Sequence, residues 1–275
     1  MNALTSGSGR QGGSDTLKIT RYQLRDVLRS RWILLYGLFF VLLTDLLFRF
    51  GGSGERVILS LLNVVLIGIP LVSIVLGAMY MYASREFTEM LLAHPVRRRS
   101  LFLGLFAGLS LPMSTAFVLG TALPYLAHGG GAAGGWGPLA FLLGTGVALT
   151  LVFLALSFLV AVATEDRIRG LGLCLGAWIA FAVVYDAVIL MAIYLLGDFP
   201  LERPVIALSM LNPVDLARIL LLLEFDISAL MGFTGALFRD FFGGTGGRLA
   251  AMGALLAWLA VPFALGMRSF GRKNF

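Results

Sequence analysis

The sequence predicts an all-α integral membrane protein with six transmembrane helices. Of its 275 residues, 59% are hydrophobic and 13% are charged, whereas soluble domains carry about 25% charged residues. The mean hydropathy is +0.91. Six apolar runs approach or exceed the length of about 20 residues that a helix needs to cross the hydrocarbon. The net charge of +6 is dispersed over the ends of these runs, which favours a role in membrane orientation over a nucleic-acid-binding face.

The six expected spans differ in length and in their prolines. Pro70, Pro112 and Pro262 fall inside apolar runs, where neighbouring helices can satisfy the carbonyls that a proline leaves unbonded. We therefore expect kinks at these prolines rather than helix ends. The expected spans are residues 32–48, 57–83, 101–127, 138–164, 171–196 and 249–267.

Two segments precede the first span. Residues 1–16 are rich in Gly, Ser and Thr and lack an apolar core, so they are expected to form a disordered leader rather than a cleaved signal. In residues 17–31, four basic side chains recur at spacings of three and four and share one side of a helix. This pattern predicts an interfacial helix, and the alternative is a charged start of the first span. The four are Lys18, Arg21, Arg25 and Arg29.

Lys and Arg set the expected orientation. If the N-terminus lies inside, the inner segments hold most of the 21 basic residues, which fits the excess of Lys and Arg on cytoplasmic segments. We therefore expect both termini in the cytoplasm and the protein in a bacterial inner membrane.

The segment before the last span is ambiguous. Asn212 can cap a helix, Pro213 suits its first position, and Asp215 complements its positive end. Helices over residues 214–223 and 229–242 are too short to span, so we expect a pair of outer helices that dip into or lie on the membrane. The alternative is a seventh span over residues 205–223, which would place the basic C-terminus outside.

A short charged stretch, REFTEMLLAHPVRRRS, separates the second and third spans on the expected cytoplasmic side. Pro95 disfavours helix at His94, so a helix from about Arg85 should end there. Its apolar face has the spacing i, i+3, i+4 and i+7, and residues 97–99 are three arginines suited to the anionic inner leaflet. The face consists of Phe87, Met90, Leu91 and His94.

The run SREFTEMLLAHPVRRRSLFLG resembles the first cytoplasmic loop of ABC-2 type transporter permeases. In that family an acidic helix, Leu-Leu, Pro and a Gly opening the third span mark the coupling helix, which docks into a groove of a separate ATPase subunit. A Lys often follows that Gly, whereas Leu105 follows Gly104 here. The resemblance implies an ABC-2 type transmembrane domain over residues 17–275. It also implies ATPase-coupling roles for Arg85, Glu86, Phe87, Glu89, Met90, Leu91 and His94.

A narrower resemblance covers nearly the whole chain after the leader. The loop at residues 85–99 and the run LNPVDLARILLLLEFDISALMGFTGALFRDFFG are similar to ABC-2 permeases that support copper-site maturation of nitrous oxide reductase in denitrification. That subgroup implies a homodimer with two cytoplasmic ATPases and a periplasmic β-helix protein on the outer helices. The implied partner-binding residues are Asn212, Asp215, Arg218, Glu224, Asp226, Arg239 and Asp240.

The sequence lacks the motifs of common catalytic sites. There is no GxxxxGK[ST] phosphate loop, no HExxH and no GxSxG, so we expect a non-catalytic subunit that binds no cofactor, with ATP and Mg²⁺ on the partner ATPase. Cys and Met suit Cu(I), but Cys174 is the single cysteine and the ten methionines show no MxxM spacing. We therefore expect no metal site, and purified protein should not retain stoichiometric copper.

Two acids fall inside expected spans, Asp45 near the outer end of the first and Asp186 deep in the fifth. Intramembrane acids are by default functional. For Asp186 the alternatives are pairing between helices and a role in a conduction path, and for Asp45 snorkelling to the outer interface. Small residues at GxxxG spacing permit close helix approach at Gly104 and Gly108 and at residues 172 and 176.

Two other functions stay open from the sequence. The chain could be an ABC-2 exporter of a drug, lipid or glycan, or a membrane scaffold without an ATPase partner. Identification of co-purifying proteins discriminates among the three, because an ATPase alone supports the exporter and an ATPase with a periplasmic β-helix protein supports the maturation role.

Overall fold

The computed structural model is built of helices, and it describes residues 31–51, 54–92, 97–129, 136–195, 202–224 and 244–272. No strand occurs within these ranges. The helices are α2 (Arg31–Gly51), α3 (Gly54–Ala83), α4 (Arg85–Leu92), α5 (Arg98–Ala127), α7 (Trp136–Ala163), α8 (Arg167–Ile179), the π-helical segment η1 (Ala180–Val184), α9 (Tyr185–Leu195), α10 (Glu202–Met210), α11 (Pro213–Glu224) and α13 (Thr245–Arg272).

Six of the described helical segments are long and apolar enough to cross a membrane, which confirms the expected multi-pass all-α fold. The fifth is not one regular helix, because α8 passes through η1 into α9. Pro70, Pro112 and Pro262 lie inside continuous helices, as expected. The apolar spans are helical because hydrocarbon offers no partner for unbonded backbone groups.

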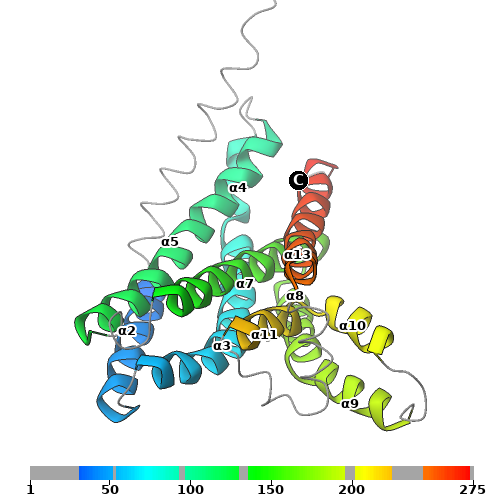
Figure 1. Ribbon diagram of the computed structural model, residues 1–275. Helices are drawn as coiled ribbons and strands as arrows, with labels where there is room; N and C mark the ends of the chain where they lie inside the picture. The colour runs from blue at the N-terminus through cyan, green and yellow to red at the C-terminus, as the bar shows by residue number, and fades with distance from the viewer. Residues whose placement is uncertain are drawn as a thin grey trace, which may run out of the picture.

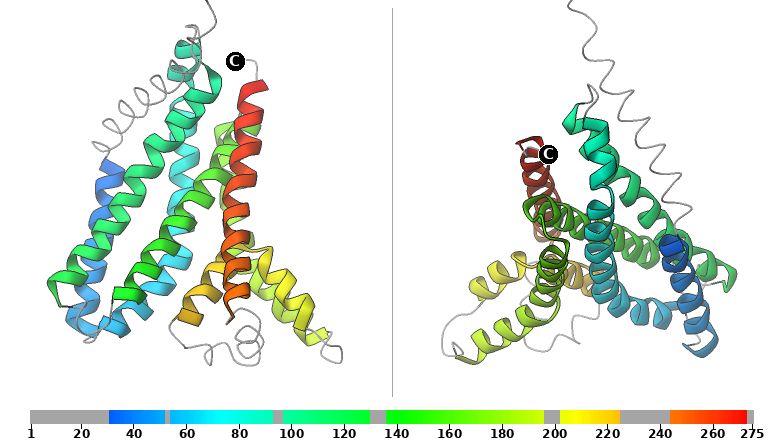
Figure 2. Two further views of the ribbon diagram at one scale, coloured as in Figure 1. Left: turned by 45° about the horizontal axis from the view of Figure 1, so that its top comes forward. Right: turned by 180° about the vertical axis from the view of Figure 1, so that it is seen from behind.

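Helix α7 occupies the centre of the bundle and contacts α3, α5, α8, α11 and α13. Figure 2 (left) shows α2, α5, α3, α7 and α13 running side by side, with α4 and the C-terminal end of α13 at one end. We call this the α4 end. Helices α9, α10 and α11 lie toward the opposite end, called the α11 end (Figure 1).

Small residues permit the closest helix crossings. At the α2–α5 crossing, a Cβ atom placed on Gly120 would lie 2.8 Å from the carbonyl oxygen of Gly37 and 3.0 Å from Cβ of Phe40. Gly104 and Gly108, which were considered for a helix-packing face, are buried within this single copy. At Gly172 and Gly176 an added Cβ meets nothing within 4 Å, so that face of α8 is open.

Within its described residues, the ambiguous segment forms α10 and α11, of which α10 was not expected. Helix α11 is close to the expected residues 214–223, and nine of its 12 residues are buried. It packs against α3, α7 and α13, so it dips into the bundle rather than lying on its surface. Helices α10 and α11 are separated at Leu211 and Asn212, and neither belongs to the six candidate spans.

Several predicted features lie outside the described residues. They are the leader, the interfacial helix except for Arg31, the second outer helix over residues 229–242, and His94, Asp226, Arg239 and Asp240. These features remain predictions.

The Gly120 contact predicts a packing defect. Gly120→Ala should destabilise the protein by about 1 to 3 kcal/mol, because the new methyl group meets main chain that cannot rotate away. Thermal unfolding in detergent measures the effect. Gly144→Ala is the matched control, because an added Cβ there meets nothing within 4 Å. Equal melting temperatures for the two variants would contradict the crossing geometry.

Candidate functional site

Arg85, the first residue of α4, binds the carboxyl end of α7. Its guanidinium donates from Nη1 to the carbonyl oxygen of Glu165 at 2.6 Å and from Nη2 to that of Ala161 at 3.1 Å. A further bond joins Nη2 to the Thr164 carbonyl. The last carbonyls of a helix lack intrahelical partners and carry partial negative charge. One cation here bonds the Ala161 carbonyl of α7 and the two carbonyls that directly follow the helix. Arg85 thereby fixes the start of α4 to the end of α7.

Tyr82 reinforces this contact from the last turn of α3. Its hydroxyl lies 2.6 Å from Oγ1 of Thr164, and the Arg85 guanidinium stacks over its ring, 4.6 Å from the ring centroid. A Cβ on Gly170 would overlap the Tyr82 hydroxyl, so the first turn of α8 also lies against the ring. We call Tyr82, Arg85 and Thr164 the clamp, since together they join α3, α4 and the α7–α8 connection.

The outward surface of α4 is acidic and partly apolar. Glu86, Glu89 and Met90 are exposed, Met90 to 59%, and their spacing places them on one face. Thr88 is buried, and Leu91 packs against the core of the bundle. Leu91 therefore anchors α4 in this single chain, whereas the sequence pattern had placed it on the docking face.

At the α11 end, one arginine joins two carboxylates. Nη1 of Arg218 lies 3.0 and 2.9 Å from the two oxygens of Asp186 and 3.1 Å from Oδ1 of Asp215. Asp215 is buried, whereas Arg218 and Asp186 are half-buried. We call these three residues the ion triad. It links α11 to the fifth span, and it supports the pairing alternative for Asp186.

Side chains from two spans hydrogen-bond to carbonyls beside the turn between α10 and α11. Tyr185 donates its hydroxyl to the Leu208 carbonyl at 2.6 Å, and Trp258 Nε1 donates to the Met210 carbonyl at 3.2 Å. Asn212 caps α11, since its Oδ1 accepts from the Val214 amide at 2.9 Å, while its Nδ2 donates to the Phe181 carbonyl at 2.8 Å. The Phe181 carbonyl lies within η1, so Asn212 joins the two helix interruptions.

The predicted outer-partner residues do not share one exposed surface. Asn212 and Asp215 are buried at 0% and 5% exposure, because their side chains hold α11 in place. Glu224 is half-buried and lies 3.8 Å from Arg248 of α13. The Asn-Pro pattern located the cap correctly. The distant partners, Asp186 for Arg218 and Phe181 for Asn212, lie more than thirty residues away in sequence, and no local pattern indicates them.

Asp45 joins a second ion cluster at the end of α2. Its carboxylate lies 2.8 Å from Nε of Arg49 and 3.5 Å from Nε2 of His128. The His128 ring stacks on Phe48 with ring centroids 5.0 Å apart. Asp45 therefore connects the ends of α2 and α5, a role that the sequence did not reveal because His128 had no assigned partner.

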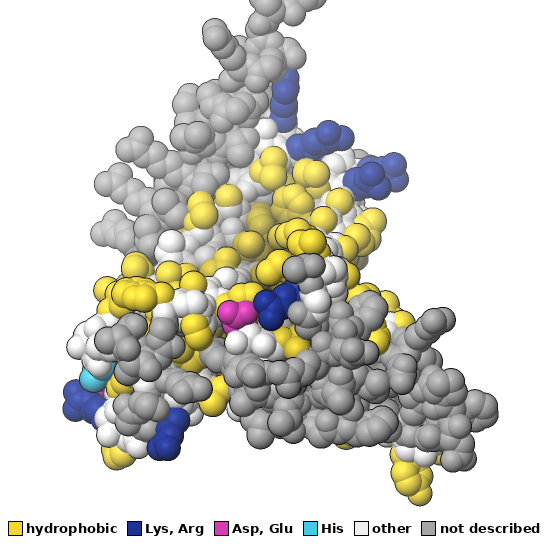
Figure 3. All heavy atoms as spheres, in the orientation of Figure 1, with side chains coloured by type: hydrophobic (Ala, Val, Ile, Leu, Met, Phe, Trp, Pro, Cys, Tyr) yellow, Lys and Arg dark blue, Asp and Glu magenta, His cyan; other side chains and the backbone are white. Residues whose placement is uncertain are grey.

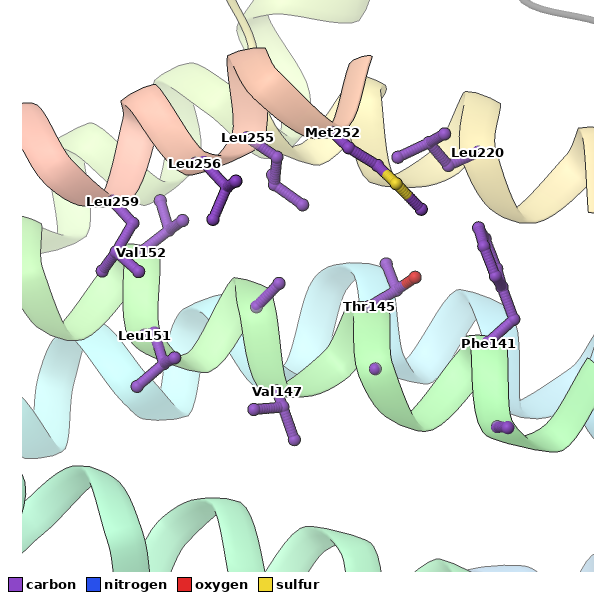
Figure 4. A pocket seen from close by; sticks show the side chains of 13 residues that line it. Phe141, Thr145, Val147, Leu151, Val152, Leu220, Met252, Leu255, Leu256 and Leu259 are labelled. Carbon is purple, nitrogen blue, oxygen red and sulfur yellow. The ribbon is translucent and has the colours of Figure 1, made fainter. Parts of the chain in front are cut away.

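A groove of about 400 Å³ opens between α7, α11 and α13. Figure 4 shows Phe141 and Thr145 of α7 pointing toward Met252 and Leu220 across it. Thr145 supplies a hydroxyl in an otherwise apolar lining. Within the described ranges, no group of three or more His, Cys, Asp or Glu side chains is arranged to hold a metal ion.

Burial raises the pKa of Asp215 to about 7. Desolvation is the largest cause, the Arg218 charge opposes it, and the Asp186 carboxylate adds to the increase. The folded protein therefore holds a proton on Asp215 that the unfolded chain releases at a lower pH. The contribution of Asp215 to stability is greatest below its unfolded pKa of 3.8 and falls as pH rises from there toward 7.

The ion triad predicts different effects on stability when its buried acid or its arginine is replaced. Asp215→Asn should remove the fall in melting temperature that Asp215 causes between about pH 4 and 7, because the side chain no longer ionises. Arg218→Met should destabilise the protein by about 1 to 3 kcal/mol, since it leaves the half-buried Asp186 carboxylate and the buried Asp215 without this hydrogen-bond donor. The exposed Asp166→Asn serves as the control that keeps the pH dependence. An unchanged pH profile in Asp215→Asn would contradict this assignment.

The amino-acid sequence is similar to those of two named transporter permeases and to one family model. The chain is 29% identical over 230 residues to the "Probable ABC transporter permease protein NosY" of Pseudomonas aeruginosa, covering 78% of this chain and 84% of that protein. It is 28% identical over 285 residues to the protein of the same name from Stutzerimonas stutzeri, covering 93% and 97%. Residues 65–275 match the model of the ABC-2 family transporter proteins, a range that includes the clamp and the ion triad. The chain therefore belongs to the ABC-2 family of transporter proteins.

Proposed function

We propose that this chain is the membrane subunit that couples ATP hydrolysis by a separate cytoplasmic ATPase to movement at the outer face of a bacterial inner membrane. The observation that carries the proposal is α4, a short helix with an acidic outer face that is clamped to the end of the central helix α7. Both termini and the α4 end lie in the cytoplasm, in keeping with the excess of Lys and Arg there. ATP and Mg²⁺ bind to the partner ATPase.

Glu86, Glu89 and Met90 form the surface of α4 that meets the ATPase, and the half-buried Phe87 extends it. A short helix with an apolar element suits insertion into a groove of a partner, and its two carboxylates favour a basic rim around that groove. His94 lies close behind α4 in the sequence and completes the predicted set.

The clamp transmits a displacement of α4 to the rest of the bundle. Arg85 bonds three carbonyls at the end of α7, so α4 cannot rotate without moving α7 or breaking these bonds. Helix α7 in turn packs against α11, and the ion triad joins α11 to the fifth span. This contiguous path connects the two ends of the molecule.

The outer function follows from the similarity to the NosY proteins. We assign the chain to a system of NosD, NosF and NosY type that supports assembly of the copper sites of nitrous oxide reductase. NosF is the ATPase, and NosD is a periplasmic β-helix protein that binds near Glu224 and the segment containing Asp226, Arg239 and Asp240. Handling of the copper or sulfur cargo belongs to the outer partner, and this chain supplies the movement.

The functional unit is a homodimer. The α8 face at Gly172 and Gly176 has no heavy atom within 4 Å of an added Cβ, and small residues at this spacing allow two helices to approach closely. This face is the candidate contact between the two copies.

Export of an apolar molecule is the second candidate function. The groove between α7, α11 and α13 has an almost wholly apolar lining, which suits a lipid-like or drug-like cargo. Recovery of an ATPase without any periplasmic protein would favour export over the maturation role.

Charge reversal on α4 tests the docking surface. Glu86→Lys with Glu89→Lys should weaken ATPase binding about tenfold or more, because the acidic face then repels a basic groove rim. Co-purification of the ATPase with the tagged chain measures the loss. Asp166→Lys with Glu165→Lys reverses two exposed acids of the neighbouring connection and serves as the control. Undiminished ATPase recovery from the α4 variant would contradict the docking role.

Replacement of Arg85 in the clamp separates binding of the ATPase from the effect of this chain on ATP hydrolysis. Arg85→Met should leave ATPase recovery intact, since Glu86 and Glu89 remain, but it should abolish the effect of this chain on the rate of ATP hydrolysis. The reason is that α4 loses its bonds to α7. Arg169→Met, at a side chain that is 83% exposed, is the matched control. Normal stimulation of hydrolysis in Arg85→Met would refute the clamp as the coupling element.

A further inference from the structure

The π-helical segment η1 changes which backbone groups bond to each other in the fifth span. The amide of Tyr185, the residue that follows η1, donates to the carbonyl of Ala180, five residues back. In an α-helix the same amide would bond the Phe181 carbonyl, four residues back. Asn212 of the α10–α11 turn bonds that carbonyl instead, from Nδ2 at 2.8 Å. A side chain next to α11 therefore takes the place of a backbone donor of the fifth span.

Two further contacts fix the direction in which the side chains of α9 point. The hydroxyl of Tyr185, the first residue of α9, donates to the Leu208 carbonyl of α10 at 2.6 Å. The next residue, Asp186, pairs with Arg218 of α11 at 2.9 Å. We call these two contacts and the bond from Asn212 to η1 the register bonds. All three join the segment at η1 and the start of α9 to α10, α11 or the turn between them.

Conversion of η1 into regular α-helix would turn α9 about its own axis. An α-helix advances by about 100° and about 1.5 Å per residue, and a π-helical turn contains one extra residue. If regular α-helix absorbs this residue, each residue of α9 takes the place of the residue that follows it. Tyr185 then lies where Asp186 lay, and Asp186 no longer faces Arg218.

The two forms of η1 exchange one set of hydrogen bonds for another. In the π-helical form Asn212 supplies the donor for the Phe181 carbonyl, whereas in the α-helical form the Tyr185 amide supplies it. A carbonyl without a donor is costly inside the hydrocarbon, so an angle of α9 between the two forms is disfavoured. Turns of π-helix are rare overall and frequently lie at functional sites. These constraints allow two discrete arrangements of the fifth span.

We propose that η1 is a two-state joint at which displacement of α11 turns α9 by one residue. While α11 stays in place, Asn212 keeps η1 π-helical and Asp186 remains paired with Arg218. When α11 moves away, the register bonds break together, η1 becomes α-helical and α9 rotates. In the coupling path described above, the joint converts displacement of α7 and α11 into rotation of α9. Only this last step rests on the proposed function.

Deletion of Val183, an exposed residue of η1, tests the joint with every register bond present. Spin labels at Leu42 of α2 and Val188 of α9, exposed to 58% and 49%, are measured by double electron–electron resonance in the full chain after Cys174→Ala. An excess of unlabelled chain restricts the signal to distances within one copy. The deletion should make η1 α-helical and leave α9 in place, so the distance should not change.

A release variant without the register bonds should give the opposite result. Asn212→Ser keeps a capping hydroxyl but removes the Nδ2 donor, while Tyr185→Phe and Arg218→Met remove the other two contacts. The distance from Leu42 to Val188 should shift to the value that a label at the half-buried Ile189 gives in the chain with intact register bonds. Deletion of Val183 from the release variant should restore the original distance.

Tyr194→Phe with Arg169→Met makes two of the same substitutions at exposed side chains and should leave the distance unchanged. An unchanged Val188 distance in the release variant, or a distribution that matches neither reference, would overturn the proposal. If the release variant does not fold, the deletion decides alone, because a π-helical η1 that persists would move Val188 to the place of Ala187. No ATPase is present, so failure of the proposed coupling leaves this test unaffected, and failure of the joint leaves the α4 experiments unaffected.

Discussion

Main-chain carbonyls at the interruptions of helices have no water to bond in the interior of a bilayer, and each unsatisfied group there costs several kcal/mol. In this protein, side-chain donors from other helices supply the missing partners. Asn212 bonds the Phe181 carbonyl in η1, and Tyr185 and Trp258 bond the carbonyls at the end of α10. At the exposed α4 end, Arg85 bonds the carbonyls at the end of α7 in the same way. The positions of α4 and α11 depend on these bonds.

The same hydrogen bonds determine where two helical segments can move relative to each other. An interruption allows two helical segments to move relative to each other, and a side-chain donor from a third element links that movement to its own. Arg85 links α4 to α7, whereas Asn212 and the ion triad link α11 to the fifth span. Helix α7 has no break between these two places. In the proposed coupling it transfers displacement as a rigid element.

The two ends of the molecule differ in how their charges are arranged. At the α11 end, Arg218 neutralises Asp186 and part of Asp215 within the protein. At the α4 end, where Figure 3 shows dark blue side chains gathered, five arginines of α5 and α13 line one pocket. The first arrangement stabilises a packed helix, and the second places the charges at the ends of two candidate spans. Both follow from the cost of placing charge near hydrocarbon.

Local patterns predicted much of the fold. The six spans followed from run length and composition, α4 followed from its flanking proline and its charged surface, and the cap at Asn212 followed from the Asn-Pro pair. The π-helical break in the fifth span and the separate helix α10 were not predicted, because propensity and hydropathy do not register where a distant side chain bonds a carbonyl. The Arg218–Asp186 pair and the contact of Arg98 with Gly271 also join positions far apart in sequence.

The distance between the ends of α2 and α10 during the ATP cycle tests the central claim most directly. Spin labels at Phe50 and Leu211, both exposed at the α11 end, can be measured by double electron–electron resonance in the assembled complex after the buried Cys174 is replaced by Ala. Coupling through the clamp predicts that trapping the ATPase with ATP shifts this distance in the chain with Arg85 and not in Arg85→Met. An equal shift in both chains, or no shift while ATP is hydrolysed, would contradict the account.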